Sequence, residues 1–284
     1  MGDVRWDVPL RLLGGLHELA LETGAAPWDD VGSVLAEHRE RLERFVAERS
    51  VQTNEVQRAW PLLPAFLLVA REVGRPLDLL ELGPSAGLNL VWDRYGYRYR
   101  AGTWGDLSAW LVLEGEERTP VPGDLLGGGV EIARRRGVDL EPIDVSTEEG
   151  ARRLECFVWP DQVERLDRLR RAIDVLRLDP PELIAGDYVE LLPTLLADRA
   201  DDAVTVVFQT VSTVYLGADE LARVRTAVDD AGRAGPLAWI STRRLDEASE
   251  PGLFFELELA IWPGGERRVV ARMHVHGHWL DWRG

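Results

Sequence analysis

The stretch "LDLLELGPSAGLNLVWDRYG", residues 77–96, joins a short apolar run to a glycine-bearing turn and then to a helical pattern. An apolar run of this length is typical of a buried strand. In the turn, Gly83, Ser85 and Gly87 fit G-x-S-x-G, the nucleophile elbow of serine hydrolases. With Glu81 included, the same letters fit an acidic-x-Gly-x-x-x-Gly turn of the kind that holds nucleotide-like cofactors. The function depends on which of the two turns this is.

The position of the turn along the chain separates the two interpretations. A nucleophile elbow follows several strands and an oxyanion-hole loop, whereas residues 1–76 contain no convincing strand pattern. A cofactor turn follows the first strand of an open sheet, where the next helix points its N-terminus at the ligand. The sequence therefore favours the cofactor turn. The hydrolase alternative would use Ser85, Asp187 and one of His274, His276 or His278.

After residue 77, short apolar strands alternate with amphipathic helices. This alternation predicts an α/β fold with a mostly parallel sheet that helices cover on both faces. The two last strand patterns flank Pro263, Gly264 and Gly265 and predict a terminal antiparallel hairpin. The predicted strands are 77–82, one within 130–145 that ends near Asp139, one within 181–193 followed by a turn, 203–216, 236–242 and the pair at 254–279, and the predicted helices are 87–96, 159–178 and 218–232.

The N-terminal quarter reads as helices. Residues 34–50 carry one apolar stripe on a charged helix, and 58–74 form a second helical stretch that Pro61 and Pro64 are expected to break and Gly74 to close. The predicted organisation is an N-terminal helical cap at 1–76 and an α/β domain at 77–284 with an inserted hairpin at about 97–115.

Composition limits the classes of function. A formal net charge of −16 repels the phosphate backbone of nucleic acids. All 33 basic residues are arginines, so a Walker-A phosphate loop and a lysine Schiff base are excluded. The fingerprint G-x-G-x-x-G is also absent, because Ser85 and Leu88 occupy its second and third glycine positions. These observations favour a small-molecule substrate without a dinucleotide cofactor.

The sequence also indicates the compartment. The single cysteine, Cys156, cannot form an internal disulfide, which is typical of a reducing environment. The longest apolar run, 61–70, is too short to span a bilayer, and the N-terminus lacks the apolar core of a signal peptide. We therefore predict a cytoplasmic protein with no membrane partner, and its oligomeric state stays open.

In the order of its motifs, the chain resembles the class I S-adenosylmethionine-dependent methyltransferases. "LELGPSAG" resembles their first motif, "GVDLEP" the end of their second strand, "IAGDYVELLP" the stretch after their third, and "VVFQTVSTVYL" their fourth strand. The resemblance implies a Rossmann-like methyltransferase-type sheet and S-adenosylmethionine as cofactor. It also implies roles for six residues: Gly83, Ser85 and Gly87 around the methionine part, Glu81 below the turn, Asp139 on the ribose hydroxyls and Asp187 at the adenine amine.

More specifically, "ELGPSAGLNLVWDRYGY", "GVDLEPIDV" and "FVWPDQVERL" resemble an uncharacterised bacterial family, domain of unknown function 2332. Ser85 and Pro84 depart from the methyltransferase pattern, since a glycine and an amide donor are usual there. A non-catalytic binding protein that keeps the fold is therefore an alternative. The strand-two acid is either Asp139, if the inserted hairpin accounts for its distance from Gly87, or Asp106, which has nearer the usual spacing of about 20 residues.

The acceptor side offers several candidates. Gln209, Thr210, Ser212 and Tyr215 follow a central strand at the edge where open α/β sheets bind ligands, or they merely satisfy a sharp turn. The polar segment "QTNEVQR" places Asn54, Glu55 and Arg58 either over the site or at an exposed helix start.

Aromatic residues and histidines complete the candidates. Trp60, Trp92 and Trp104 are candidates for the wall of an apolar acceptor pocket. On a strand, His274 and His278 would lie about 13 Å apart at 3.3 Å per residue, so we predict no metal site. His276 is instead a candidate general base. The resemblance implies a methyltransferase that acts on an unknown small molecule, and a non-catalytic binding protein and a serine hydrolase that uses Ser85 remain the alternatives.

Overall fold

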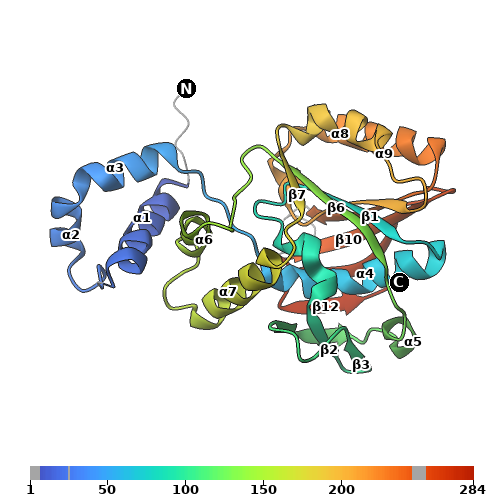
Figure 1. Ribbon diagram of the computed structural model, residues 1–284, viewed down its shortest axis with the longest axis horizontal. Helices are drawn as coiled ribbons and strands as arrows, with labels where there is room; N and C mark the ends of the chain where they lie inside the picture. Colours follow the sequence, from blue (N-terminus) through green and yellow to red (C-terminus); the bar gives the residue numbers. More distant parts are fainter. Residues whose placement is uncertain (1–6, 25, 245–253) are drawn as a thin grey trace.

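A computed structural model describes residues 7–24, 26–244 and 254–284, and its centre is a nine-stranded sheet with helices on both sides (Figure 1). The strand order is β5-β12-β11-β10-β9-β8-β1-β6-β7. Strands β7, β6, β1, β8 and β9 are parallel neighbours, and β9, β10, β11 and β12 are antiparallel neighbours. The bounds are β1 Leu77–Leu82, β5 Glu116–Thr119, β6 Ile132–Asp139, β7 Glu182–Ala185, β8 Val204–Gln209, β9 Leu237–Arg244, β10 Phe254–Trp262, β11 Arg268–His274 and β12 Trp279–Trp282.

The first strand along the chain is β1, which lies in the middle of the parallel strands and has the bounds that the sequence predicts. All six of its residues are buried, as expected for a strand with parallel neighbours on both edges and helices on both faces. It pairs with β6 on one side and with β8 on the other. The order of strands along the sheet therefore reverses at β1, and the crevice outside the carboxyl ends of β1 and β8 is the expected ligand position in such a sheet.

Two layers of helices cover the sheet (Figure 1). Helices α8 (Tyr188–Ala197) and α9 (Ala218–Ala234) pack on the face that carries Leu80, Leu82 and Val207. Helices α4 (Ala59–Val73) and α7 (Val163–Arg177) pack on the face that carries Leu79, Val206 and Phe208. The prediction of a mostly parallel sheet with helices on both faces is confirmed.

Helix α4 corrects one expectation, because it runs unbroken through Pro64. Pro64 has no N–H to donate to the carbonyl oxygen of Trp60, four residues earlier, but the Tyr99 hydroxyl donates to that oxygen instead. Pro61 lies in the first turn, where no intrahelical donor is needed, and Gly74 ends the helix at φ 60°. Although α4 falls within residues 1–76, it packs against the central sheet.

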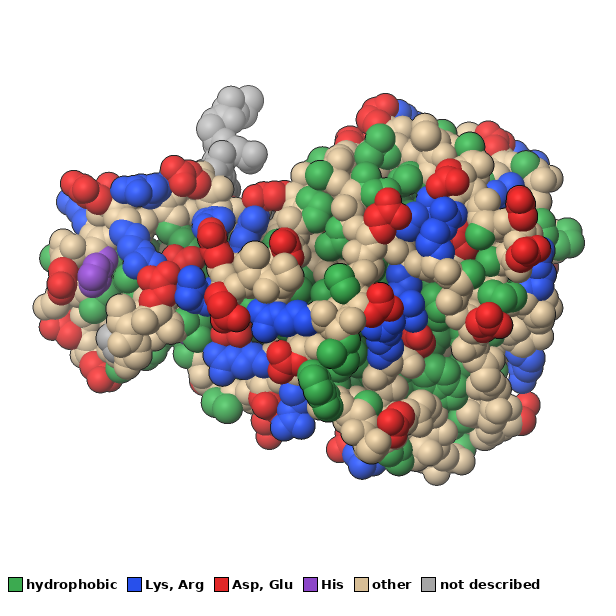
Figure 2. Space-filling view, in the orientation of Figure 1, with side chains coloured by type: hydrophobic (Ala, Val, Ile, Leu, Met, Phe, Trp, Pro, Cys, Tyr) green, Lys and Arg blue, Asp and Glu red, His purple; other side chains and the backbone are tan. Residues whose placement is uncertain are grey.

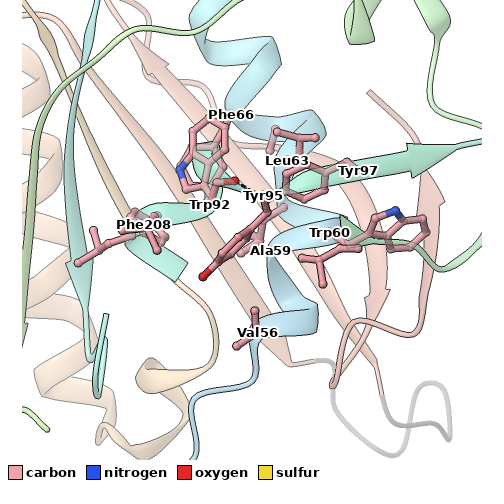
Figure 3. Close-up of a cluster of buried hydrophobic side chains, with 14 of the residues drawn as sticks. Val56, Ala59, Trp60, Leu63, Phe66, Trp92, Tyr95, Tyr97 and Phe208 are labelled. Atoms are coloured by element: carbon pink, nitrogen blue, oxygen red, sulfur yellow. Dashed lines mark hydrogen bonds between the residues drawn. The ribbon is translucent and has the colours of Figure 1, made fainter. Parts of the chain in front are cut away.

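Figure 3 shows the aromatic core around α4. Phe66 stacks on Trp92 with ring centroids 4.5 Å apart, and Trp60 stacks on Tyr99 at 5.2 Å. Trp104 also belongs to this buried cluster. The three tryptophans proposed as pocket walls are therefore packed in the core, because their rings contact other aromatic rings rather than open space.

The first three helices, α1 (Val8–Thr23), α2 (Val31–Glu37) and α3 (Arg39–Glu48), project from the body as a separate lobe (Figures 1 and 2). The single helix predicted over 34–50 is divided at His38, which has non-helical dihedral angles. Acidic and arginine side chains are interspersed over the face in Figure 2. No helix in the described part of the chain combines the length and apolar character needed to cross a membrane.

The helix predicted over 87–96 is instead a short 3-10 helix, η2 (Leu88–Arg94), with non-helical dihedral angles at Val91. The hydroxyls of Tyr95 and Tyr97 donate to the carbonyl oxygens of Leu88 and Trp92, so side chains satisfy groups that another helical turn would have used. The chain then enters β2 (Gly96–Tyr99), which forms an antiparallel hairpin with β3 (Gly102–Trp104) and pairs with β4 (Val112–Leu113). This antiparallel pair lies within the stretch where the sequence predicts an inserted hairpin.

The remaining helices are short, and the terminal hairpin has the expected form. Helix α5 (Gly123–Leu126) follows β5, and α6 (Glu148–Glu155) follows β6. The 3-10 helices η1 (Val56–Arg58) and η3 (Ser212–Tyr215) precede α4 and α9. Strands β10 and β11 pair antiparallel, as predicted, and β12 adds a further antiparallel strand.

Candidate ligand site at the carboxyl edge of the sheet

The turn after β1 lies against the end of β6. The Gly83 N–H donates to the carbonyl oxygen of Val138 at 2.9 Å, and the Ser85 N–H donates to Asp139 Oδ2 at 2.9 Å. The Gly186 N–H donates to the carbonyl oxygen of Asp139 at 2.8 Å. The first glycine of the turn, the last residue of β6 and the turn after β7 are therefore held side by side at one edge of the sheet.

Three residues of this turn have left-handed backbone conformations: Gly83 at φ 70°, Ser85 at φ 56° and Gly87 at φ 83°. A Cβ atom on Gly83 would lie 2.5 Å from Ser212 Cβ, and one on Gly87 would lie 2.9 Å from Pro181 Cγ. Only glycine fits at these two positions. Ser85 adopts its conformation with the help of Asp139 and keeps a buried hydroxyl that has no hydrogen-bond partner.

Glu81 lies beneath the turn and is fully buried. Neither of its carboxyl oxygens has a hydrogen-bond partner within the described ranges of the chain. Burial, and then the nearby charge of Asp139, raise the pKa of Glu81 to about 8, although Arg58 partly opposes the shift. At neutral pH the Glu81 carboxyl is therefore mostly protonated, and it can donate one hydrogen bond.

The other two predicted acids hold backbone turns. Asp139 Oδ1 accepts from the Glu141 N–H at 3.0 Å, so each of its oxygens has one backbone donor and can accept another. Asp187 is exposed, and its Oδ1 accepts from the Val189 N–H at 2.8 Å as the N-cap of α8. The alternative acid, Asp106, accepts from Ser108 within the insert. Asp139, not Asp106, contacts the glycine turn.

The segment 50–58 crosses this edge of the sheet. Asn54 Oδ1 accepts from the Leu88 N–H at 2.9 Å, and Glu55 Oε2 lies 2.7 Å from Arg165 Nε. Arg58 Nε donates to the carbonyl oxygen of Val275 at 2.7 Å. Glu55 is buried and Arg58 half-buried. Of the two interpretations of this segment, the one in which it lies over the site fits these contacts.

Sequence reasoning missed one polar residue next to the turn. Asn89, in η2, is 1% exposed, and neither its Oδ1 nor its Nδ2 has a partner. An asparagine inside the apolar run "LNLVW" was the available signal, because a buried amide normally requires hydrogen-bond partners.

The polar residues after β8 serve the turn itself. Gln209 is fully buried, donates to the carbonyl oxygen of Thr242 at 2.9 Å and accepts from the Val211 N–H at 2.6 Å. Ser212 Oγ donates to the carbonyl oxygen of Leu82 at 2.6 Å. Tyr215 is 76% exposed. Gln209 and Ser212 therefore position backbone, and Tyr215 is the candidate that reaches solvent.

The three C-terminal histidines correct an expectation. They do not share a strand face, because β11 ends at His274 and Gly277, at φ 76°, closes a turn by donating to the carbonyl oxygen of His274. The turn brings the imidazoles together, with His274 and His278 centroids 4.8 Å apart. Nonetheless, no group of three His, Cys, Asp or Glu side chains among the described residues is arranged to hold a metal ion.

His276 lies beside the segment 50–58, with Nδ1 3.9 Å from Glu55 Oε2. Burial lowers the pKa of His276 to about 4, against the opposing effect of Glu55. Its imidazole is therefore neutral at pH 7, which is the form that accepts a proton.

The groups of the hydrolase alternative are not assembled. Ser85 Oγ makes no hydrogen bond to a histidine, and the Asp187 carboxylate caps α8 rather than orienting an imidazole. An activated serine requires a base within hydrogen-bond reach.

Comparison with known proteins gives a family but no function. A family model described as an uncharacterized protein conserved in bacteria, DUF2332, matches residues 4–282. No curated protein matches the sequence.

Proposed function

The chain belongs to this uncharacterised bacterial family, and we propose that it is a methyltransferase that binds S-adenosylmethionine at the carboxyl edge of β1, β6 and β7. The observation that carries the proposal is the contact between Asp139, at the end of β6, and the glycine turn after β1. It lies in a sheet whose parallel strands follow the order 3-2-1-4-5 when numbered along the chain, the order of doubly wound nucleotide-binding sheets.

The charge and hydrogen-bonding capacity of the edge fit this ligand. Asp139 ends β6, and Asp187 follows the neighbouring strand β7. An ionised carboxylate accepts hydrogen bonds and does not donate them. A ribose diol and an adenine amine supply the matching donors. A sulfonium cation is compatible with an acidic protein of net charge −16, whereas a pyrophosphate would be repelled.

The turn would hold the ligand mainly through side chains. Its backbone donors at Ser85 and Leu88 are already bound by Asp139 and Asn54, and Pro84 has none. The buried Ser85 hydroxyl and the protonated Glu81 carboxyl lack partners, so they are the groups available to the methionine part. In this arrangement Ser85 replaces the usual glycine contact with a hydroxyl.

Bound S-adenosylmethionine supplies an activated methyl group, and its transfer is an in-line displacement in which positioning gives most of the acceleration. The chain would contribute by fixing the ligand with Asp139 and Asp187 and by excluding water with the segment 50–58. His276 is neutral at pH 7, but with its pKa lowered to about 4 it is a weak base, so we assign it no proton-transfer role.

Calorimetric titration with S-adenosylhomocysteine tests the cofactor site. We expect binding near micromolar strength, about −8 kcal/mol, and a loss of at least about tenfold in Asp139→Ala, because the ribose hydroxyls lose a charged acceptor. Asp202→Ala, at an exposed carboxylate before β8 and thus at the opposite edge, is the matched control and should bind like the wild type.

A second variant separates ligand contact from folding. Asp187→Ser keeps a side chain that caps α8 but removes the carboxylate, so it should weaken binding without lowering the melting temperature. An absence of heat at millimolar ligand, or equal affinities for wild type and Asp139→Ala, would refute the proposal.

A further inference from the structure

A cleft of about 260 Å³ lies at the carboxyl ends of β8 and β9, on the side of the sheet covered by α9. Its volume is just below the roughly 300–1,000 Å³ of most ligand pockets, so it suits a small molecule. Its walls combine apolar side chains with several arginines. The residues that matter here are Val214, Leu221, Trp239, Arg225, Arg243 and Arg244.

The cationic lining is unusual for so acidic a chain, since among the described residues three arginines and one acid, Glu258, line the cleft. Arg243 is bound by Glu256 and Glu258. Arg225, an exposed residue of α9, makes no hydrogen bond or ion pair with any described residue. The cleft therefore offers a guanidinium that the described part of the protein does not neutralise.

A buried donor in the same cleft also lacks a partner. Trp239 is 4% exposed, and its indole Nε1 has no hydrogen-bond acceptor among the described residues. A buried N–H without an acceptor is costly, and an acceptor-bearing ligand would satisfy it. Two donors, one cationic and one neutral, thus stand beside the apolar surfaces of Val214 and Leu221.

The turn 210–213 connects this cleft to the glycine turn. Thr213 lines the cleft, whereas Ser212 lies against Gly83. Val211 has φ 147°, an outlier for a β-branched residue, and such outliers gather at functional sites. The buried Gln209 holds Val211 in place through its N–H.

We propose that this cleft binds a small carboxylate with an apolar body, and that this molecule is the methyl acceptor, a role that rests on the proposed function. Arg225 binds the carboxylate, the Trp239 N–H supplies a second donor, and Val214 and Leu221 contact the apolar part. The carboxylate-binding site itself does not depend on the cofactor.

Benzoate and its neutral isostere benzamide are suitable probes, titrated into the full chain by NMR with and without S-adenosylhomocysteine. We expect benzoate to bind about tenfold more tightly than benzamide, the effect of one charge-assisted hydrogen bond. Arg225→Gln should remove that difference. Arg223→Gln, on the same helix but paired with Glu190, should leave it intact. The indole resonance that disappears in Trp239→Phe should shift with benzoate.

The outcomes distinguish the two proposals. Equal binding of benzoate and benzamide, or a preference that survives Arg225→Gln, would overturn the carboxylate cleft even if S-adenosylhomocysteine binds. Arg225-dependent benzoate binding without any binding of S-adenosylhomocysteine would support the cleft and refute the methyltransferase proposal. If benzoate binds more tightly than benzamide but does not shift the Trp239 indole resonance, then the anion binds elsewhere and the assignment is overturned.

Discussion

Asp78→Ala is expected to lower the free energy of unfolding by about 3–5 kcal/mol, because it removes one partner of a buried ion pair. Asp78, in β1, is fully buried and accepts from Arg134 at 2.9 and 3.0 Å, from Arg136 at 3.3 Å and from Thr205 at 3.3 Å. Arg136 is only 2% exposed. Without Asp78, the partners left to its guanidinium in the described part of the chain would be the oxygens of Asp198, whose side chain is 72% exposed.

Urea denaturation followed by circular dichroism measures this loss. Asp78→Asn keeps the shape and one acceptor, so it provides a milder variant if the alanine variant does not fold. Glu43→Ala removes an exposed pair with Arg39 and should change stability by less than about 1 kcal/mol. A loss below about 1 kcal/mol for Asp78→Ala would show that β1 does not depend on this charge network.

The wild type is expected to lose stability relative to Glu81→Gln as the pH rises from about 5 to 8, because the comparison isolates the titration of Glu81 from that of the histidines. The folded pKa of Glu81 is raised to about 8 from an ordinary value of 4.5. Between these values the unfolded chain is ionised and the folded chain protonated, so unfolding releases a proton. The stability that the wild type has below pH 4.5 relative to Glu81→Gln is therefore lost as the pH approaches 8. This loss amounts to roughly 3–5 kcal/mol.

Urea titrations of both proteins at pH 5, 6.5 and 8 test this prediction. Because glutamine is neutral and nearly isosteric, Glu81→Gln should gain stability relative to the wild type as the pH rises. A difference between the two proteins that stays constant from pH 5 to pH 8 would mean that Glu81 is ionised in the folded protein.

Many strands of the sheet could be predicted from the sequence, because buried parallel strands consist of short apolar runs. The "LDLLEL" run gives β1 without error, and the second strand ends at Asp139 as expected. The inserted hairpin is also evident from its alternating aromatics. In each case the local pattern and the tertiary packing favour the same structure.

The errors occur where side chains or turns outside a predicted element decide its backbone. The sequence near Pro64 does not indicate that the Tyr99 hydroxyl donates a hydrogen bond to the Trp60 carbonyl oxygen. The helix predicted after Gly87 is replaced by η2, whose carbonyl groups accept hydrogen bonds from the hydroxyls of Tyr95 and Tyr97, just after it in the chain. The proximity of the three histidines depends on the turn at Gly277, which a strand-period count does not reveal.

In the candidate site, too, some residues could be predicted from the sequence and others only from the structure. Pattern and resemblance identify Glu81, Ser85 and Asp139, and the structure brings these three to one edge of the sheet. No local pattern marks Arg225 of the cleft, and Asn89 is marked only by its place inside an apolar run. Their significance comes from missing partners, which only a three-dimensional arrangement defines.

A crystal structure of the protein grown with S-adenosylhomocysteine tests the central claim most directly. The account predicts the ligand at the turn 83–88, with its ribose hydroxyls on Asp139 and its adenine amine facing Asp187. A complex in which the ligand lies elsewhere, or crystals in which Asp139 still contacts only the amides of Ser85 and Glu141 at saturating ligand, would contradict it.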